Sequence, residues 1–262
     1  MRVPTFLAAA CLMLVSCQQE EGCTDAAATN YDPNAVEDDG SCEYDLEAPQ
    51  PILDGYTYDV VTIGDQVWFA ENLRTTVYAN GDPIPFSLTD DEWVSTNAGA
   101  TAVYGEGNSD CTNYSPDLDA CDEAQSLAEY GRLYNWYAVD DARGLCPVGW
   151  HVPTDEEWSD LEDFITAQGF SDTEGTALKS TYGWYDGGNG TDDFGFSALP
   201  GGYRFSVNGS FVDAGYGGYW WSSSPFDGSA WLRNLYNFDS VIYRYYDNPC
   251  FGLSVRCLRD AE

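Results

Sequence analysis

The chain has 262 residues, of which 44 are acidic and 10 are lysine or arginine, so its formal net charge is −34. A charge of this sign and size repels nucleic acids and anionic lipid surfaces, which excludes both as binding partners. A hydrophobic fraction of 44%, including 15% aromatic residues, supplies ample core material, so the composition also excludes a disordered protein.

The N-terminus has the pattern of a bacterial export segment. Arg2 precedes an apolar run over residues 6–15 that is too short to span a bilayer as a folded element. The run ends in Leu-Val-Ser-Cys at residues 14–17, which resembles a bacterial lipobox, and the acidic residues that follow resemble the tethers of some Bacteroidota surface lipoproteins. We therefore expect a lipoprotein signal peptide over residues 1–16 and a lipid on Cys17. An ordinary secretory signal is the alternative.

This interpretation predicts the location and the cysteine chemistry. The lipid would hold the protein at the outer membrane, on the cell surface or on the periplasmic face. An oxidising compartment favours disulfides among the seven cysteines that remain after Cys11 and Cys17 are set aside. The expected pairs leave Cys250 free, and a Cys146–Cys250 bridge is the alternative. These pairs are Cys23 with Cys42, Cys111 with Cys121, and Cys146 with Cys257.

Residues 17–44 hold a small Cys/Asp-rich module with too few apolar residues to build a core. Its many carboxylate and amide oxygens suit calcium, although the spacing does not match an EF-hand loop. The module resembles short Cys-rich units of bacterial surface proteins and thrombospondin type 3 repeats. We expect a calcium site here, with a simple spacer as the alternative. The predicted ligands are Asp25, Asn30, Asp32, Asn34, Asp38 and Asp39.

Residues 45–55, which include Pro49 and Pro51, are expected to be a linker before a main domain over residues 56–262. That domain should begin with a β-hairpin, whose strands over 56–63 and 66–69 meet at Gly64-Asp65. Residues 86–126 are polar and acidic, so we expect them to form an inserted surface loop.

Two helices are expected next. The first should span the apolar positions around residues 133–137 and end at Gly144. The second has a clearer start, because Thr154 and Glu157 have the spacing of a capping box and apolar residues follow at helical spacing.

Beyond residue 183, short aromatic runs predict strands at 196–199, 219–222, 230–235, 242–246 and 253–258. Strands and helices do not alternate, so the sequence predicts an α+β domain with a mostly antiparallel, twisted sheet.

The aromatic and amide-rich stretch near the C-terminus is the expected binding site. Its tyrosines and tryptophan offer rigid amphipathic surface, and its amides and charged groups offer directed hydrogen bonds, as in sugar-stacking platforms and other binding surfaces. About half of these side chains must face the core, because side chains alternate along a strand. The candidate ligand-binding residues are Trp231, Arg233, Asn234, Tyr236, Asn237, Asp239, Tyr243, Arg244, Tyr245 and Asp247.

Several phrases together resemble the FISUMP, or Fibrobacter major paralogous, domain over roughly residues 56–260. They include residues 130–139 (Tyr-Gly-Arg-Leu-Tyr-Asn-Trp-Tyr-Ala-Val), residues 146–154 (Cys-Pro-Val-Gly-Trp-His-Val-Pro-Thr), residues 218–223 (Gly-Tyr-Trp-Trp-Ser-Ser) and residues 254–257 (Ser-Val-Arg-Cys). This resemblance implies a C-type-lectin-like fold of the broad type shared with formylglycine-generating enzymes. The acidic insertion with Cys111 and Cys121, and the additional Cys250, depart from the usual pattern.

The functional expectation is a non-catalytic surface protein that binds a glycan or a protein. The chain has a single histidine, His151, which lies within a framework motif and is therefore expected to be structural. One alternative is a copper oxidase of the formylglycine-generating type, with Cys250 and Cys257 as thiolate ligands. Another is a structural or adhesion component of the envelope.

Overall fold

The computed structural model describes residues 21–22, 33–38, 50–107 and 109–261, which belong to two compact units, residues 1–49 and 50–262. In the first unit, β1 (Glu21–Gly22) pairs in parallel with β2 (Glu37–Asp38). Of the predicted calcium ligands, Asn34 lies in a turn and Asp38 in β2. The lipid, calcium and Cys23–Cys42 predictions stay predictions, because the other residues involved lie outside the described ranges. These are Cys17, Cys23, Asp25, Asn30, Asp32, Asp39 and Cys42.

The second unit begins earlier than the sequence suggests. Strand β3 (Ile52–Leu53) pairs with β4 (Tyr56–Thr57) in a short antiparallel hairpin. Leu53 is buried, and the Tyr58 amide donates to the carbonyl of Pro51. Residues 51–55 are therefore part of the folded domain, which corrects the predicted linker over 45–55.

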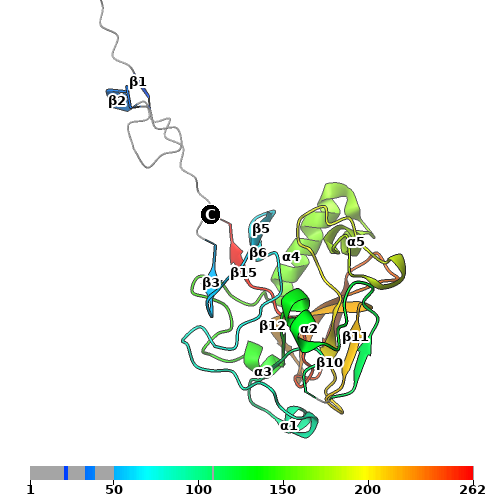
Figure 1. Cartoon of the computed structure of the whole chain (residues 1–262). Coiled ribbons are helices and arrows are strands. Elements are labelled where there is room, and N and C mark those ends of the chain that lie inside the picture. Colours follow the sequence, from blue (N-terminus) through cyan, green and yellow to red (C-terminus); the bar gives the residue numbers. More distant parts are fainter. Residues whose placement is uncertain (1–20, 23–32, 39–49, 108, 262) are drawn as a thin grey trace, which may run out of the picture. The chain divides into compact units, whose positions relative to one another are not determined.

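A three-stranded sheet brings the two ends of this unit together. Strands β5 (Val60–Ile63) and β6 (Gln66–Phe69) form the predicted hairpin, and β15 (Leu258–Asp260) pairs antiparallel with β6. Leu258 lies opposite Trp68, and both are fully buried. Figure 1 shows β5, β6 and β15 side by side.

Two further sheets carry the functional region. Strands β12 (Gly217–Phe226), β13 (Ser229–Tyr236) and β14 (Tyr243–Asp247) form an antiparallel meander. Beside it, β10 (Gly201–Arg204) pairs antiparallel with β11 (Phe211–Ala214), and β8 (Cys111–Asn113) joins β11 in parallel. The predicted strands at 219–222, 230–235 and 242–246 are thus confirmed in substance.

Helix α4 (Asp155–Ile165) begins at the predicted capping box, because the Thr154 hydroxyl accepts from the Glu157 amide while the Glu157 carboxylate accepts from Thr154. Its buried face packs under the meander, with Trp158 and Leu161 in one cluster with Trp220 and Leu235. A π-helical turn (Thr166–Phe170) and α5 (Glu174–Leu178) follow. The other predicted helix is only one turn, α3 (Trp136–Val139), since the chain leaves the helix at Asp140, before Gly144.

Residues 86–126 are not a surface loop. They contain α1 (Asp90–Ser95), β7 (Thr101–Ala102), which pairs with β9 (Leu133–Tyr134), then β8, and the first residues of α2 (Glu123–Tyr130). Trp93 and Tyr104 are buried in the core, and one of the acidic residues, Glu106, is buried as well. The prediction was wrong because it rested on the acidic composition of the segment and overlooked the apolar residues, such as Trp93 and Tyr104, that pack into the core.

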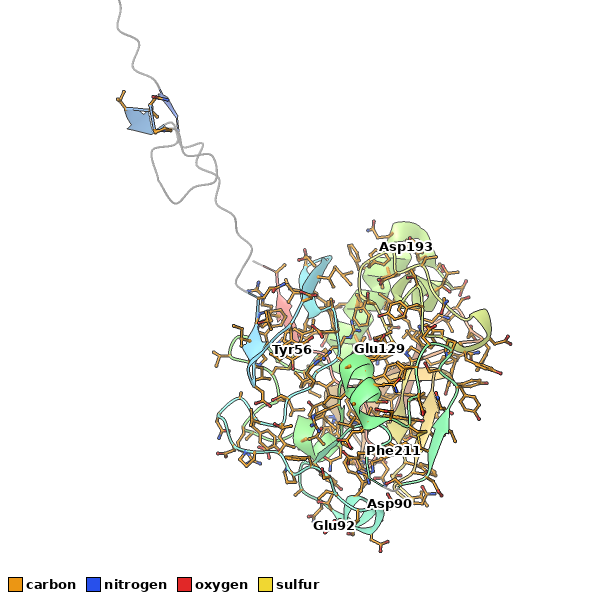
Figure 2. The ribbon with its side chains drawn as sticks, viewed as in Figure 1. Tyr56, Asp90, Glu92, Glu129, Asp193 and Phe211 are labelled. Atoms are coloured by element: carbon orange, nitrogen blue, oxygen red, sulfur yellow. A yellow bond between two sulfur atoms is a disulfide. The ribbon has the colours of Figure 1, made fainter. Side chains whose placement is uncertain are left out.

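Buried Arg204 connects this region to β10 and β11. It pairs with Asp90 at 3.2 Å and Glu106 at 3.1 Å, and its guanidinium lies 4.9 Å from the centroid of the Phe211 ring. Figure 2 shows Asp90 and Phe211 at the same end of the domain.

The predicted strands at 196–199 and 253–258 form single bridges instead of continuous ladders. Ala198 pairs with Lys179, while Leu253 pairs with Tyr134 and Ser254 with Trp220. The 253–257 segment is buried, and its backbone bonds to several separate neighbours, namely Tyr134, Tyr219, Trp221, Leu73 and Phe69. Only Leu258 enters a regular strand, β15. Helices combined with mostly antiparallel strands confirm the α+β class.

Two predicted disulfides are confirmed, Cys111–Cys121 and Cys146–Cys257, and Cys250 is free. Across the described ranges, we find no helix with the length and apolar character that a membrane span requires.

Candidate ligand-binding site

A cavity of about 510 Å³ opens between the β12–β14 meander, the β10–β11 pair and the segment before the last strand. Its walls are mainly aromatic rings, with two carboxylates and one amide among them. The lining residues are Tyr203, Asp213, Tyr219, Leu232, Asn234, Tyr236, Tyr243, Tyr245, Asp247, Phe251 and Leu253.

Strand alternation decides which predicted residues reach this cavity. Within the meander, Asn234 lies opposite Tyr219 on one side and Tyr243 on the other. Residues directly opposite each other in neighbouring strands share a face, and so do residues two apart along a strand. The cavity face therefore carries five of the ten predicted residues, namely Asn234, Tyr236, Tyr243, Tyr245 and Asp247.

Three predicted residues lie on the opposite face and connect the meander to helix α4. Arg233 is buried and bonds to Asp155 at 2.7 Å and to the Glu162 carboxylate. Arg244 also pairs with Asp155 at 2.7 Å, and its guanidinium lies 3.5 Å from the centroid of the Trp231 ring. Trp231, Arg233 and Arg244 thus do not line the cavity.

The remaining two predicted residues shape the turn between β13 and β14. The Asn237 side-chain amide donates to the carbonyl of Tyr185 at 3.1 Å. Asp239 accepts from the Tyr243 hydroxyl at 2.5 Å and from the Ser240 amide at 2.7 Å. The bond from Tyr243 holds the pKa of Asp239 below its usual value. Asp239 thus positions Tyr243, Asn237 fixes the turn to Tyr185, and neither residue lines the cavity.

Sequence reasoning missed the other wall of the cavity. Tyr203 packs against Tyr219, with 5.1 Å between ring centroids, and against Phe251 at 5.5 Å. Asp213 accepts a hydrogen bond of 2.9 Å from the Tyr219 hydroxyl. These residues come from β10, β11, β12 and the segment after β14, so only the assembled fold brings them together.

The most informative polar group is the side-chain amide of Asn234. Asn234 is only 4% exposed, and its side chain makes no hydrogen bond with any other described residue. Its polar atoms are not sealed from solvent, because they border the open cavity, where water can bond to them until a ligand takes its place. In the wall of a cavity, such an amide is available to a ligand.

Burial also raises the pKa values of several ionisable groups in the cavity wall. It raises the pKa of Asp213 and of Asp247, and the bond from Tyr219 opposes the shift at Asp213. It raises the pKa of Tyr203 to about 12 and moves that of Tyr219 further upward. Tyr203 and Tyr219 are therefore neutral hydrogen-bonding groups at physiological pH.

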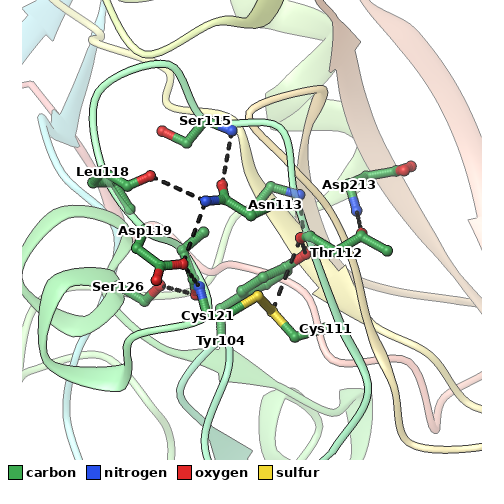
Figure 3. Close-up of a disulfide and its surroundings, with 12 residues drawn as sticks. Tyr104, Cys111, Thr112, Asn113, Ser115, Leu118, Asp119, Cys121, Ser126 and Asp213 are labelled. Carbon is green, nitrogen blue, oxygen red and sulfur yellow. Dashed lines mark hydrogen bonds between the residues drawn. A yellow bond between two sulfur atoms is a disulfide. The ribbon is translucent and has the colours of Figure 1, made fainter.

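The Cys111–Cys121 disulfide supports the β11 wall (Figure 3). It closes the segment next to β8, where the Thr112 hydroxyl accepts from the Asp213 amide at 3.3 Å. The Tyr104 hydroxyl donates to the carbonyl of Thr112 at 2.5 Å and accepts from the Ala214 amide at 3.2 Å. Asn113 closes the loop further by donating to the carbonyl of Leu118 at 3.2 Å. These contacts fix the backbone that carries Asp213.

Residues 61–259 match the family model described as Fibrobacter succinogenes major domain. The chain belongs to this family. The match confirms the family resemblance and includes every residue that lines the cavity. Searches among curated proteins and among solved structures each gave no match.

The sulfur and imidazole groups of this Fibrobacter succinogenes major domain lie outside the cavity. Cys257 is bonded to Cys146, so the pair of free thiolates that the copper-oxidase alternative requires is not formed. Cys250 lies 3.8 Å from the carbonyl of Thr96. His151 bonds to Glu157 at 2.7 Å, beside the start of α4. Within the described ranges, no group of three or more His, Cys, Asp or Glu residues could hold a metal ion.

Proposed function

We propose that the protein is a non-catalytic, lipid-anchored surface protein whose major domain binds a glycan in the cavity between β10–β11 and β12–β14. The observation that carries this proposal is the unpartnered amide of buried Asn234, set among tyrosine rings. Sugars present hydroxyl groups around a ring with apolar C–H faces. Tyrosine rings can stack on those faces while the amide and the carboxylates bond to the hydroxyls.

The shape of the site favours a glycan over a protein surface. Cavities of about 300–1,000 Å³ are typical of small-ligand sites, and the 510 Å³ cavity lies within this range. Protein partners usually meet a broader surface of about 800 Å² on each side. A segment of a glycan chain fits the cavity better than such a surface does.

Two further parts of the proposal have other support. The lipobox-like residues 14–17 favour a lipid on Cys17 and a location at the outer membrane. A C-type-lectin-like arrangement is supported by the pairing of β15 with β6 and by the Cys146–Cys257 bridge, since both join distant parts of the domain.

The glycan proposal can be tested with two neighbouring tyrosines. Tyr245 lines the cavity and is 61% exposed, whereas Tyr246 is 47% exposed, does not line the cavity, and packs against Phe226 and Trp231 as well as stacking on Tyr245 with 5.8 Å between ring centroids. A glycan array identifies a ligand for the purified protein, and calorimetry then compares the variants. We expect Tyr245→Ala to weaken binding about tenfold, the loss of one stacking contact, and Tyr246→Ala to change it less than about twofold.

Two outcomes would contradict the proposal. One is the absence of binding by the unaltered protein to every glycan on the array. The other is an equal loss of affinity in both variants while each keeps the melting temperature of the unaltered protein. The second outcome would place the binding surface outside the cavity.

A further inference from the structure

The charges that line the cavity all have one sign. Asp213 and Asp247 contribute carboxylates, and none of the lining residues is a lysine, an arginine or a histidine. Arg233 and Arg244, the nearest basic residues along the strands, belong to the opposite face, where Asp155 pairs with both. The cavity thus presents negative charge that no lining residue neutralises.

Each carboxylate keeps one oxygen available. The Tyr219 hydroxyl bonds to Oδ2 of Asp213, and the Asn248 amide bonds to Oδ1 of Asp247 at 2.8 Å. The other oxygen of each group accepts no hydrogen bond from another described residue. The side-chain oxygen of Asn234 also accepts no hydrogen bond from another described residue. The cavity wall therefore offers three acceptor oxygens without a protein donor.

Aromatic faces complete this pattern. Tyr203, Tyr219 and Tyr236 form an edge-to-face series, with ring centroids 5.1 Å and 6.0 Å apart, and Tyr243 lies 5.6 Å from Tyr236. The negative face of an aromatic ring attracts a cation, most strongly where water is excluded. Rings combined with carboxylates are the chemistry that recognises an ammonium group.

We propose that the cavity selects a glycan that carries a protonated amine, such as a glucosamine unit, over the corresponding neutral sugar. This inference rests on the proposed function and names its ligand class. An ammonium group on a sugar unit can donate to the free oxygen of Asp213 or of Asp247, which lie on different strands of the cavity wall, and either contact pairs it with an opposite charge. A neutral hydroxyl would leave the carboxylates without an opposite charge, and an acidic sugar would be repelled.

Three β-1,4-linked trisaccharides that differ only at the C2 position test the selectivity. They are the trimers of glucosamine, N-acetylglucosamine and glucose, and calorimetry measures each against the full chain at mildly acidic pH, where the glucosamine amine is protonated. We expect the glucosamine trimer to bind at least about tenfold more tightly than the other two, because a charge-assisted hydrogen bond is roughly twice as strong as a neutral one. The preference should weaken as pH rises and the amine loses its proton.

A matched pair of variants separates the cavity from the overall charge. Asp247→Asn and Asp227→Asn each remove one negative charge, but Asp227 is exposed in the turn between β12 and β13. We expect Asp247→Asn to weaken glucosamine binding about fivefold or more and Asp227→Asn to change it less than about twofold. Melting temperatures establish that both variants fold.

Equal affinities for the three trimers would overturn the amine selectivity and leave glycan binding in place. Equal losses in the two variants would overturn it as well, because the attraction would then come from the net charge of −34. If none of the trimers binds and the glycan array is also blank, both the inference and the proposed function fail.

Discussion

At the scale of single residues, Asn234 shows how the site departs from ordinary core packing. Its neighbours on the same face, Leu232 and Tyr219, are buried and contribute to a hydrophobic cluster. Asn234 is buried with them, yet its amide has no partner among the described residues. Its polar atoms border the cavity, so the amide adds a hydrogen-bonding group to an otherwise largely aromatic wall.

Replacing Asn234 with leucine should therefore weaken binding with little effect on stability. We expect Asn234→Leu to change the free energy of unfolding by less than about 1 kcal/mol, because the amide has no protein partner to lose, and to weaken glycan binding. Urea unfolding and calorimetry measure the two effects. Asn237→Leu is the contrasting control, since it loses the bond to Tyr185 and should destabilise. Unchanged glycan binding by a stable Asn234→Leu variant would show that the amide does not contact the ligand.

The carboxyl group of Asp247 makes a prediction about pH. Burial raises its folded-state pKa above the ordinary value of 3.8, so the folded state binds this proton more tightly than the unfolded state does. Stability therefore falls as pH rises from the ordinary value through the raised one. We expect Asp247→Asn to be more stable than the unaltered protein at neutral pH, and this gain to disappear below the ordinary pKa. Urea unfolding across that range measures the difference, and a gain independent of pH would contradict the mechanism.

Which residues form the site could be predicted only in part. The composition of residues 231–247 indicated the two strands that line the cavity, but it could not indicate which face of the sheet is covered. Helix α4 decides this, because it packs against the face that carries Arg233 and Trp220. Tyr203, Asp213 and Phe251 escaped prediction because their proximity depends on pairings between distant strands.

At the scale of elements, α4 gives the meander its two unlike faces. Asp155 lies in the first turn of the helix and accepts hydrogen bonds from both Arg233 and Arg244. Burial of Asp155 opposes ionisation, but these two arginines outweigh it and hold its pKa below the usual value. The start of the helix is thereby fixed against β13 and β14, and the cavity is left on the other side.

The capping box of α4 is the easiest part of this arrangement to test. We expect Thr154→Ala to lower the free energy of unfolding by about 1 kcal/mol, because the Glu157 amide loses its acceptor. Thr154→Ser keeps the hydroxyl and should cost only a small part of that amount. Thermal and urea unfolding compare the two variants. Equal losses would show that the methyl group of Thr154, and not its hydroxyl, stabilises the helix start.

Elements whose signals lie within a few neighbouring residues were predicted well. Elements that depend on contacts between residues far apart in the sequence were not. The capping box and the turn at Gly64 are each encoded within a few residues, so α4 and the β5–β6 hairpin were found. Burial of Trp93 and Tyr104 depends on contacts with residues far along the chain, such as Phe211. For that reason the acidic 86–126 region was mistaken for a surface loop.

At the scale of the whole molecule, the two described disulfides close chain segments of very different length. Cys111 and Cys121 are 10 residues apart and brace one wall of the cavity, whereas Cys146 and Cys257 are 111 residues apart. A longer closed loop removes more conformational freedom from the unfolded chain, which stabilises the folded state more.

Removing each bridge by replacing both cysteines with alanine should show this difference. By loop length alone, the loss in unfolding free energy is about 3 kcal/mol for the Cys111–Cys121 pair and about 5 kcal/mol for the Cys146–Cys257 pair. We also expect the first variant to bind glycan more weakly, because Asp213 is held by Thr112. Urea unfolding and calorimetry measure both quantities. A larger destabilisation from the short bridge would contradict the loop-length argument.

The burial of residues 253–258 also has a consequence for how the protein folds. These residues fill the centre of the domain, where their backbone bonds to Tyr134, Tyr219 and His151, and the last of them, Leu258, begins β15. Until they are in place, the segments around those three partners lack the backbone bonds that join them. Because these bonds connect residues far apart in the sequence, their formation carries a large loop-closure entropy, which slows folding.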